Sequence, residues 1–500
     1  MISPLILHSP LFLTIGGRRA NDELNRALVL VLVRQALAAP TVAELEFVDL
    51  SHNAADLFGV GKEVRLENGE HELVFEGDIA GIEHNYEGAN GRTIRIRAYD
   101  RLQRLRTRRS AKTFNKASAG AIATKLAAEI DCDVVVARAT PERDTIIQYG
   151  QSDLDFLVDL AGDAGLYPFL FGRTLRLIGL DGEEDAVLLT LGRTLHTLQA
   201  RFSNERSLSS CEARGWNPST SSRFQVKIQT AAQDAIELRD VGTQIDAVGL
   251  IVNAVLDTEE DASALAQARM DRAASDQACV EATAPGDMRL RPGRIVQIDG
   301  VATDVAGRYV ITETLHRFSA SSGHITEFAT RAPNTPALNR APSISIGEVI
   351  DTNDPEGCGR SRVRLPAFAN VESGWMAVLA VGAGEGKGIV ALPEDGDEVL
   401  VVLPDGNPAK GIILGGLFGH QRLPRGLARR SHRPFVARTS SGQSLELSSE
   451  GGRSRLANRV GSFVDLDQNL MRLAAATDLV IEAPGRTITI RGAAINFEQG

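Results

Sequence analysis

The segment from Ile346 to Gly419 constrains the fold more than any other part of the chain. Short apolar runs alternate there with Gly, Pro, Asn and Asp, which favour turns. The runs are Gly347–Ile350, Arg362–Leu365, Met376–Val381, Val399–Leu403 and Gly411–Leu417. Runs of about five residues between turn residues are typical of a small closed or nearly closed β-barrel. We therefore predict a five-stranded oligonucleotide/oligosaccharide-binding (OB) barrel over residues 345–419.

Two stretches within this segment carry further information. Asp405-Gly406-Asn407-Pro408 predicts a tight connection between the last two strands, because Gly, Asn and Asp tolerate positive φ. The run EVLVVL, residues 398–403, shows no polar alternation. Such a run is typical of a strand that is covered on both faces.

The same residues resemble the OB domain of VgrG-type spike proteins. The resemblance rests on Gly374-Trp375-Met376, the Gly-rich Gly382–Gly388, Leu392-Pro393-Glu394, Gly396–Val399 and the closing Ile412–Gly419. That family comprises the central spikes of type VI secretion systems, contractile phage baseplates and extracellular contractile injection particles. It implies that the barrel is the trimeric collar of a needle. An OB barrel that binds nucleic acid or sugar is the alternative.

Composition restricts the partners of this chain. With 500 residues it is long enough for about three domains. Its net charge of −10 and aromatic content of 5% do not suit binding to a phosphate backbone, which needs basic patches and stacking platforms. The four cysteines, Cys132, Cys211, Cys279 and Cys358, lie far apart without a CxxC pair. We therefore predict no nucleic-acid partner, no metal and no cofactor.

Residues 1–335 read as two β-rich regions around a helical part. The sequence predicts one β-barrel over 1–110, helices within 111–199 and a second barrel over about 200–335. Leu73–Phe75 and Gly77–Ile82 read as separate runs, and Asn90-Gly91 as a turn. Helices are expected over 118–130, from Ser152 to a C-cap at Gly165, and over Glu259–Ala274, with Ser118 and Ser152 as N-caps.

This region resembles the tail hub of the same family. The residues that carry the resemblance are Asp100–Leu105, the stretch QYGQSDLDFL at 148–157, Ala213–Pro218, Pro292-Gly293, Gly307, Tyr309-Val310, His316 and Gly323-His324. Cys211 stands where the pattern has a valine. The resemblance therefore implies a hub over residues 1–335.

Four groups of residues could be given a chemical role, and each has a structural explanation. The basic cluster Arg101, Arg104, Arg106, Arg108 and Arg109 is interpreted as a solvated edge that pairs with acidic residues. Asp153, Asp155, Asp159 and Asp163 spread around a helix, so a metal or acid/base site is not favoured. His316 and His324 can meet across a hairpin but lack a third ligand. Gly382–Gly388 has the wrong spacing for a phosphate loop and is interpreted as a tight, packed barrel connection.

The rest of the chain reads as linkers and a repetitive tail. Residues 336–344 and 420–436 are predicted linkers, and 437–500 contain short alternating segments. The periodicity allows either a single-chain β-solenoid or three intertwined chains. The resemblance favours the second, a triangular β-prism that forms a needle. The predicted fold class is thus mainly β with a few helices: hub β-barrels with helical insertions, an OB-fold barrel and a C-terminal intertwined trimeric β-helix or prism.

The chain carries no transmembrane segment or convincing signal peptide. We expect assembly in the bacterial cytoplasm, within a phage-tail-like particle that is released or membrane-attached. Enzyme motifs are absent from the sequence, and the 17 residues of 420–436 are too few for a lysozyme domain. No catalytic, cofactor-binding or metal-binding residue is assigned. A cell-wall-degrading spike enzyme and a glycan- or nucleic-acid-binding module are the alternatives.

The function that the resemblance implies is a non-enzymatic homotrimeric spike and hub of a contractile injection machine. It would adapt a three-fold spike to a six-fold inner tube and puncture a target envelope. The expected partners are two further copies of the chain, a hexameric Hcp-like tube protein and baseplate proteins. A PAAR-like tip protein is expected near Asn496–Gly500, and effector cargo is a further expected partner.

Overall fold

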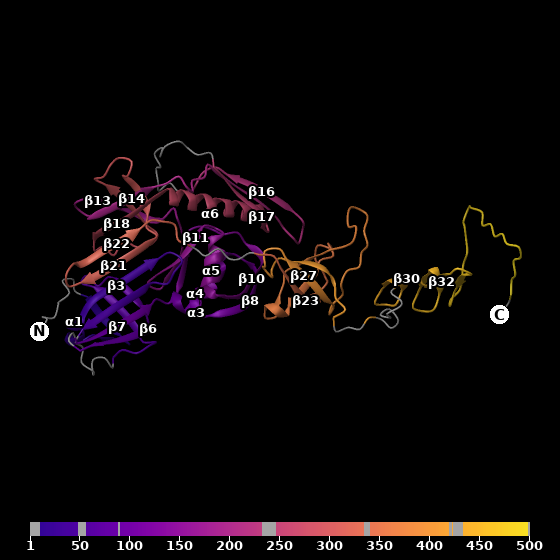
Figure 1. Cartoon of the computed structure of the whole chain (residues 1–500), viewed down its shortest axis with the longest axis horizontal. Coiled ribbons are helices and arrows are strands. Elements are labelled where there is room, and N and C mark those ends of the chain that lie inside the picture. The colour runs from indigo at the N-terminus through magenta and orange to yellow at the C-terminus, as the bar shows by residue number, and fades with distance from the viewer. Residues whose placement is uncertain are drawn as a thin grey trace. The chain divides into compact units, whose positions relative to one another are not determined.

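The computed structural model describes residues 11–48, 57–88, 91–232, 247–334, 341–419, 423 and 434–498. The chain divides into two compact units, Met1–Leu417 and Phe418–Gly500. Most of the two predicted linkers, 336–344 and 420–436, lies outside the described residues, as does Asn90. The fold is mainly β with a few helices, which confirms the predicted fold class (Figure 1).

An 11-stranded sheet dominates the first unit. In sheet order its strands are β14 (Thr197–Phe202), β18 (Ala278–Pro285), β22 (Gly323–Ala329), β21 (Glu313–Ser319), β3 (Leu28–Ala36), β4 (Val42–Val48), β7 (Gly91–Tyr99), β6 (Leu73–Glu87), β5 (Glu63–Asn68), β1 (Leu11–Ile15) and β2 (Arg18–Arg19). The antiparallel pair β3–β21 joins the two β-rich regions that the sequence predicts as separate barrels, with Val33 opposite His316. No local pattern reveals this pairing.

Strand β6 is longer than the sequence predicts. The runs Leu73–Phe75 and Gly77–Ile82 belong to one strand, which corrects their interpretation as separate elements. A side chain at Gly77 would place its Cβ only 2.1 Å from the carbonyl oxygen of Tyr99. Glycine at this position therefore permits close approach of two backbones rather than a break between strands.

Side-chain caps mark the starts of four of the five helices described. The helices are α1 (Asp22–Ala27), α3 (Leu102–Thr107), α4 (Ala119–Ala128), α5 (Asp153–Gly162) and α6 (Glu259–Gln277), and α3 is the exception. Ser118 and Ser152 accept hydrogen bonds from backbone N–H groups of α4 and α5, which confirms the two predicted N-caps. The C-cap of α5 is Asp163 rather than Gly165, and Gly165 follows with φ of +68°.

Four smaller sheets complete the hub part of the first unit. They contain β8 (Arg109–Ala117) with β10 (Arg143–Ser152); β9 (Asp133–Val136), β11 (Leu166–Phe171) and β12 (Thr174–Gly179); β13 (Glu183–Thr190), β19 (Arg294–Asp299) and β20 (Gly307–Val310); and β15 (Ser210–Trp216), β16 (Arg223–Ile228) and β17 (Val248–Val255). Helix α6 covers the last of these with Ala262, Ala266 and Met270, which pack with buried Cys211 and Ala213. Leu265 packs against the same cluster, and the helix predicted over Glu259–Ala274 extends to Gln277.

Residues 343–416 form the expected small barrel, with six strands rather than the predicted five because a short strand at Val371–Glu372 is added. Its sheet contains β25 (Val371–Glu372), β24 (Arg362–Leu365), β23 (Ser343–Asp351), β27 (Glu398–Leu403), β28 (Ile412–Gly416) and β26 (Ala377–Val378), in this order, with the short helix η1 (Pro366–Phe368) after β24. Two reciprocal backbone hydrogen bonds of 3.0 Å join Ser361, which precedes β24, to Met376, which precedes the end strand β26. The barrel is therefore closed around a buried core that includes Val363, Val401 and Leu403.

The strand β27 is covered on one face only, which corrects the interpretation of EVLVVL. Val399, Val401 and Leu403 are buried, whereas Glu398, Leu400 and Val402 are half-buried on the opposite face. Beside them on β23, Ile344 and Ile346 are 66% and 49% exposed. A single chain thus buries one face of β27, whereas the apolar run predicts burial of both faces.

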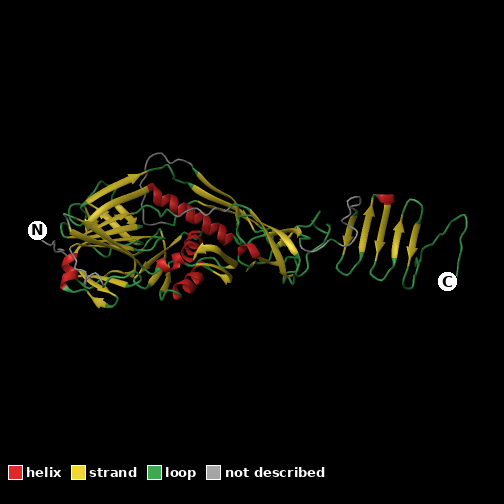
Figure 2. Ribbon diagram, turned by 60° about the horizontal axis from the view of Figure 1, so that its bottom comes forward, coloured by secondary structure: helices red, strands yellow, loops and turns green. Residues whose placement is uncertain are grey.

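The second unit contains one antiparallel sheet. Its consecutive strands are β29 (Phe435–Arg438), β30 (Ser444–Ser448), β31 (Arg453–Ala457), β32 (Phe463–Leu466) and β33 (Met471–Ala474), with the short helix η2 (Glu450–Gly452) before β31. Figure 2 shows the five strands side by side. This antiparallel order differs from the coils of the single-chain β-solenoid that the periodicity also allowed.

The loop between β23 and β24 is organised around Asp354. Its carboxylate accepts hydrogen bonds from the Arg360 guanidinium, the shortest at 2.6 Å, and from the backbone N–H groups of Glu356, Cys358 and Arg360. The hydrogen bonds from the Arg360 side chain lower the pKa of Asp354 well below its usual range. Both side chains are nearly inaccessible to solvent, at 3% and 6% exposed.

Replacement of Asp354 by alanine should destabilise the barrel by about 2–3 kcal/mol, because it leaves three backbone N–H groups without their acceptor and the buried Arg360 guanidinium with only the exposed Glu356 as an ion-pair partner. Trp375 fluorescence during urea unfolding, in a Trp216→Phe background, measures this change. The control is Glu356→Gln, since Glu356 contacts the same arginine but is 62% exposed. The control should cost less than about 0.5 kcal/mol. Equal effects of the two variants would contradict the assignment.

Candidate functional site

The hub and the barrel share a hydrophobic core, and we call this region the joint. Ile147 of β10 is 2% exposed and packs among the barrel residues Val349, Val363 and Met376. Its neighbour Tyr149 packs edge-on against Phe368 of η1, with ring centroids 5.9 Å apart. The barrel core is thus completed by a strand of the hub.

The Gly374-Trp375-Met376 motif has a physical explanation at the joint. A side chain at Gly374 would place its Cβ 3.0 Å from the hydroxyl oxygen of Thr145, on hub strand β10. The carbonyl of Trp375 accepts a 2.6 Å hydrogen bond from the Ser219 hydroxyl. Met376 is fully buried in the barrel core. The three residues therefore attach the barrel to the hub, a role that their spacing alone does not indicate.

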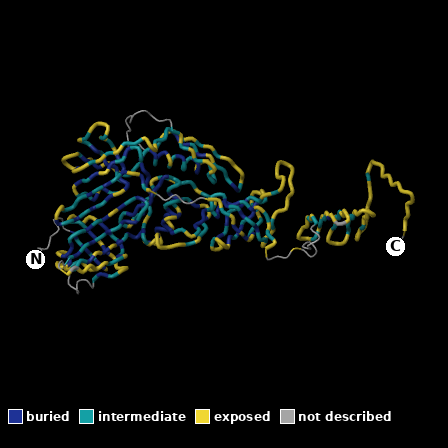
Figure 3. Tube along the Cα trace, viewed as in Figure 1, coloured by how far each residue is buried: buried dark blue, intermediate teal, exposed yellow. Residues whose placement is uncertain are grey.

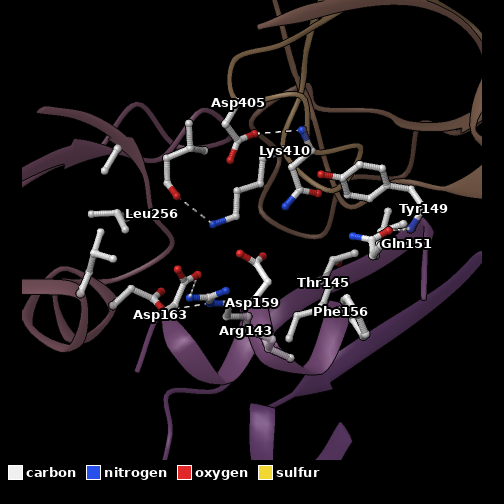
Figure 4. A pocket seen from close by; sticks show the side chains of 18 residues that line it. Arg143, Thr145, Tyr149, Gln151, Phe156, Asp159, Asp163, Leu256, Asp405 and Lys410 are labelled. Carbon is white, nitrogen blue, oxygen red and sulfur yellow. Dashed lines mark hydrogen bonds and ion pairs between the residues drawn. The ribbon is translucent and has the colours of Figure 1, made fainter. Parts of the chain in front are cut away.

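A polar cavity of about 80 Å³ lies at the joint (Figure 4). Arg143 donates to Asp261 at 2.9 Å and lies 3.4 Å from Asp163. Burial alone would lower the pKa of Arg143, but Asp163 and Asp261 outweigh it and the pKa is raised. On the barrel side, the ammonium group of Lys410 lies 3.2 Å from the carboxylate of Asp257 and donates a 3.4 Å hydrogen bond to the carbonyl of Val255.

The joint is a connection rather than a ligand pocket. Its volume is well below the roughly 300 Å³ at which pockets for organic ligands begin. Its cations pair with carboxylates of the chain itself, so little charge is left for a bound ion. Lys410 follows the Asp405–Pro408 turn, where Asn407 accepts from the backbone N–H of Ala409 at 2.9 Å. The tight turn that the sequence predicts therefore positions a lysine that contacts the hub.

Most of the predicted basic cluster pairs with acidic residues, as expected. Arg101 lies within 3.8 Å of Glu63, Glu76 and Asp131. Arg104 pairs with Asp78 at 2.7 Å, and Arg108 pairs with Glu129. Arg109 donates to the carbonyl of Gly150 at 3.0 Å. These contacts tie α3 and β8 to their neighbours within the hub.

The four aspartates of α5 have separate environments. Asp153 is buried and accepts from Gln148 at 2.7 Å and from the Ser110 hydroxyl at 3.0 Å. Asp155 accepts from the Ser152 hydroxyl at 2.7 Å, whereas Asp159 and Asp163 line the joint. Among the residues that the structure describes, no three His, Cys, Asp or Glu side chains are grouped to hold a metal.

His316 and His324 meet across the β21–β22 hairpin, as their spacing suggested. Nδ1 of His316 lies 3.3 Å from Nε2 of His324 and 3.1 Å from the Thr326 hydroxyl. His324 stacks on Phe318 with ring centroids 4.0 Å apart. Burial lowers the pKa of His316 to about 3, with a contribution from His324, and burial lowers that of His324 to about 4. The neutral pair is part of the hub core.

Two larger hollows in the hub are open grooves of about 510 and 820 Å³. Three of the six carboxylates that line them pair with arginines: Glu313 with Arg34 at 3.7 Å, Glu327 with Arg317 at 3.8 Å and Asp287 with Arg289 at 2.7 Å. Paired carboxylates of this kind are not poised for acid/base catalysis.

The Gly-rich connection between β26 and β27 is exposed rather than packed, which corrects its interpretation as a tight connection. We call residues 379–392 the arm, the orange loop that leaves the barrel in Figure 1. Residues 381–392 are all exposed, as the yellow trace of Figure 3 shows. They include Val381 at 73% and Val390 at 78% exposure. The arm is thus a strongly apolar segment without cover from its own chain.

The five-stranded sheet of the second unit has one apolar and one polar face. The cross-strand registers place on one face Phe435, Ala437, Leu445, Leu447, Ser454, Leu456, Val464, Leu466, Met471 and Leu473, and we call this set the needle face. Its leucines and Met471 are between 39% and 68% exposed. The other face carries the ladder Glu446, Arg455, Asp465 and Arg472, with Arg455 and Asp465 3.1 Å apart.

Comparison with known proteins assigns the family. The family model for the phage tail baseplate hub (GPD) matches residues 34–322. The chain belongs to this family. A second family model, the type VI secretion system/phage-baseplate injector OB domain, matches residues 345–418 of the hub protein. Both matches confirm the resemblance seen in the sequence, and both families are structural components of tail-like particles.

Solved structures share the fold at low sequence identity. The 43 kDa tail protein of prophage MuSo2 from Shewanella oneidensis is 16% identical, with a TM-score of 0.51 over 65% of this chain and 99% of its own. A type VI secretion component from E. coli, described as similar to T4 tail proteins gp27 and gp5, is 15% identical with a TM-score of 0.51 over 82% and 98%. The Francisella PdpA–VgrG complex is 10% identical with a TM-score of 0.55 over 94% and 80%. No curated protein sequence matches the chain.

None of the described helices is long and apolar enough to cross a membrane.

Truncation of Ile147 should weaken the barrel although the residue belongs to the hub. Ile147→Ala is expected to cost about 2–4 kcal/mol and to speed hydrogen exchange of the β27 amides. The matched control is Ile146→Ala, because Ile146 is buried among the hub helices instead. The control should speed exchange in α4 and leave β27 protected. Loss of protection in β27 from both variants alike would contradict a shared core at the joint.

Acidification should destabilise the hub through the histidine pair. The pKa values of both histidines are depressed in the folded chain, so the unfolded chain binds more protons than the folded chain below about pH 6.5. The free energy of unfolding therefore decreases as the pH falls below this value, by up to about 1.4 kcal/mol per pH unit for each histidine. Asp100, whose pKa burial raises to about 7, has the opposite effect on stability, because the folded chain binds its proton more tightly than the unfolded chain does. The measurement is therefore a comparison of unfolding free energies of wild type and His324→Gln between pH 7 and 5.

Wild type should lose stability relative to His324→Gln as the pH falls through this window. His71→Gln, at an exposed histidine, should keep the wild-type pH dependence. Identical pH dependence for wild type and His324→Gln would show that the pair does not titrate as its burial requires.

Proposed function

We propose that this chain is the non-enzymatic, homotrimeric central spike and hub of a contractile injection machine. The observation that carries the proposal is the bare needle face. A single layer of β-sheet buries little surface, and a stable domain needs at least two packed layers. Three copies with their needle faces turned toward a common axis supply the missing layers. Such an arrangement is a triangular prism with its charged faces outward.

The backbone pairing divides the needle into two parts. Over residues 435–474 the strands pair within one chain, so three separate sheets suffice and the chains need not exchange strands. Residues 475–498 contain no strand, and Val480 and Ile490 are 73% and 64% exposed. Extended apolar segments require pairing partners from other copies. The intertwining expected over 437–500 is therefore proposed only for the part beyond Ala474.

The barrel supports the same assembly. Ile344, Ile346, Leu400, Val402 and Ile412 form a continuous apolar strip on its outer surface, which we call the barrel face. In a trimeric collar this face meets another copy, and the run EVLVVL is then covered on both sides. The missing polar alternation of this strand is thus explained by assembly.

The hub part supplies the proposed adaptor. Each chain contains two β-rich regions within one sheet, so three copies present six comparable regions to a hexameric tube. The proposed partners are an Hcp-like inner-tube protein, other baseplate proteins, a PAAR-like tip protein near Asn496–Gly500 and effector cargo. Gln499 and Gly500 lie outside the described residues. Contraction of a sheath would drive this assembly, which is built in the bacterial cytoplasm, through a target envelope.

The two alternatives find less support. A cell-wall-degrading enzyme needs a pocket with an acid or base, and the joint cavity of about 80 Å³ cannot hold a sugar chain. A nucleic-acid-binding barrel needs a basic surface, whereas the barrel face ends at Glu348 and Glu398, which lie directly opposite each other. Clearing of peptidoglycan in a zymogram, or salt-sensitive nanomolar binding of an oligonucleotide, would support these alternatives instead.

Multi-angle light scattering of the full chain should report three copies. Leu456→Asp and Leu473→Asp each place a charge on the needle face. Either change should lower the midpoint of thermal unfolding and shift the assembly toward monomers at low protein concentration, because each trimer would bury three charges. Glu446→Gln changes the opposite, charged face and should leave the trimer intact. A stable wild-type monomer would refute the proposed assembly, and equal effects on both faces would refute the orientation of the sheets.

A further inference from the structure

The arm has a defined shape that its own barrel does not use. Its base continues the barrel, since the N–H of Leu379 donates to the carbonyl of Ile413 at 2.8 Å. The N–H of Ile389 donates to the carbonyl of Val381 at 2.9 Å, so the two sides of the arm are paired. At its tip Gly384 and Lys387 exchange two backbone hydrogen bonds of 3.2 Å around a turn in which Gly386 has φ of +67°. The arm is therefore an ordered hairpin-like projection.

Its side chains are suited to a buried contact. Leu379, Val381, Ile389 and Val390 are between 61% and 78% exposed in the single chain. Apolar side chains gathered on one exposed projection indicate a binding surface more often than isolated ones do. Lys387 stands at the tip of the arm, and no ion pair of its ammonium group exists with any residue that the structure describes.

The barrel face offers a matching surface. Its apolar strip runs from Ile344 and Val402 through Ile346 and Leu400, and it ends at the opposed pair Glu348 and Glu398. Glu348 lies 3.4 Å from Arg364. Within the described ranges Glu398 forms no ion pair, and like charges directly opposite each other destabilise a sheet. The acidic end of the strip therefore favours a cation from outside the chain.

We propose that the arm of one copy lies across the barrel face of the next copy, with Lys387 beside Glu398. This inference rests on the proposed trimer and names the contact that holds its collar together. Lys387 and Ile389 are two positions apart on the arm, and so are Glu398 and Leu400 on β27. Two positions of the extended strand β27 span about 7 Å, a distance that the two arm side chains can match. The charge contact and the apolar contact can therefore form together.

The contact closes only in a symmetric assembly. The arm and the barrel face are different surfaces, so each copy gives its arm to one neighbour and receives an arm from the other. Such a head-to-tail contact generates a ring, and in a ring of three every arm and every face is occupied. The occupant of the barrel face is therefore a second copy of this chain.

A charge exchange tests the pairing in the full-length chain. Lys387→Glu and Glu398→Lys should each raise the rate of subunit dissociation by roughly threefold to thirtyfold, since either change opposes like charges. The double variant Lys387→Glu/Glu398→Lys should return the rate to within about threefold of wild type. Subunit exchange between differently labelled trimers measures these rates. Additive effects, with the double variant dissociating faster than either single one, would overturn the contact.

A cysteine pair tests the geometry without relying on stability. In a Cys358→Ser background, which removes the exposed native thiol, Lys387→Cys/Glu398→Cys should yield a covalent trimer on denaturing electrophoresis after treatment with a short bismaleimide, because a disulfide is too short to replace a lysine–glutamate contact. Lys387→Cys/Glu372→Cys is the matched control and should remain uncrosslinked, because Glu372 lies on β25. Absence of the covalent trimer would overturn the proposed contact between the arm and the barrel face. If light scattering reports a trimer but this crosslink does not form, only that contact is refuted. A wild-type monomer would refute the proposed function as well.

Discussion

The apolar face of the sheet over residues 435–474 is the constraint on which the organisation of this protein depends. Backbone hydrogen bonds within the sheet are satisfied by one chain, but its leucines are not covered by that chain. Burial of apolar surface contributes roughly 25 cal/mol per Å², so a face of this size strongly favours association. The opposite face carries alternating charges and a phenyl ring, Phe463, between Arg455 and Arg472. In the proposed trimer, one of these faces is turned inward and the other outward, and association of copies would then be part of the folding of the tail.

The joint connects the hub and the barrel within the first unit. In the proposed spike, force would have to pass from the hub to the barrel, and a flexible linker would not transmit it. Ile147 inserts a hub side chain into the barrel core, and Lys410 returns from the barrel to the end of β17. These contacts combine a buried apolar anchor with charged groups that fix orientation. Hub and barrel are thereby held as one body, which agrees with their place in one compact unit.

Local features of the fold were predictable from the sequence, and long-range ones were not. Ser118 and Ser152 were identifiable as N-caps because capping depends on residues three positions apart. The pairing of β3 with β21 joins residues about 280 positions apart, and apolar periodicity does not reveal which strands become neighbours. The same limit applies to the site: Gly374 was recognised within a motif, but its contact with Thr145 depends on how two separate regions pack. The contact between His316 and His324 was partly predictable, because a short hairpin brings the two residues together.

The misread strand β27 shows what an apolar pattern measures. The run EVLVVL was interpreted as covered on both faces, yet one chain covers only the face of Val399, Val401 and Leu403. Selection acts on the assembled protein, so the side chains of Leu400 and Val402 reflect the environment that they meet there. The exposed arm was misjudged for a related reason, because a Gly-rich stretch predicts turns and says nothing of what its apolar neighbours contact. Where the apolar pattern of a chain predicts more burial than its own fold provides, the uncovered side chains indicate a surface that binds a partner.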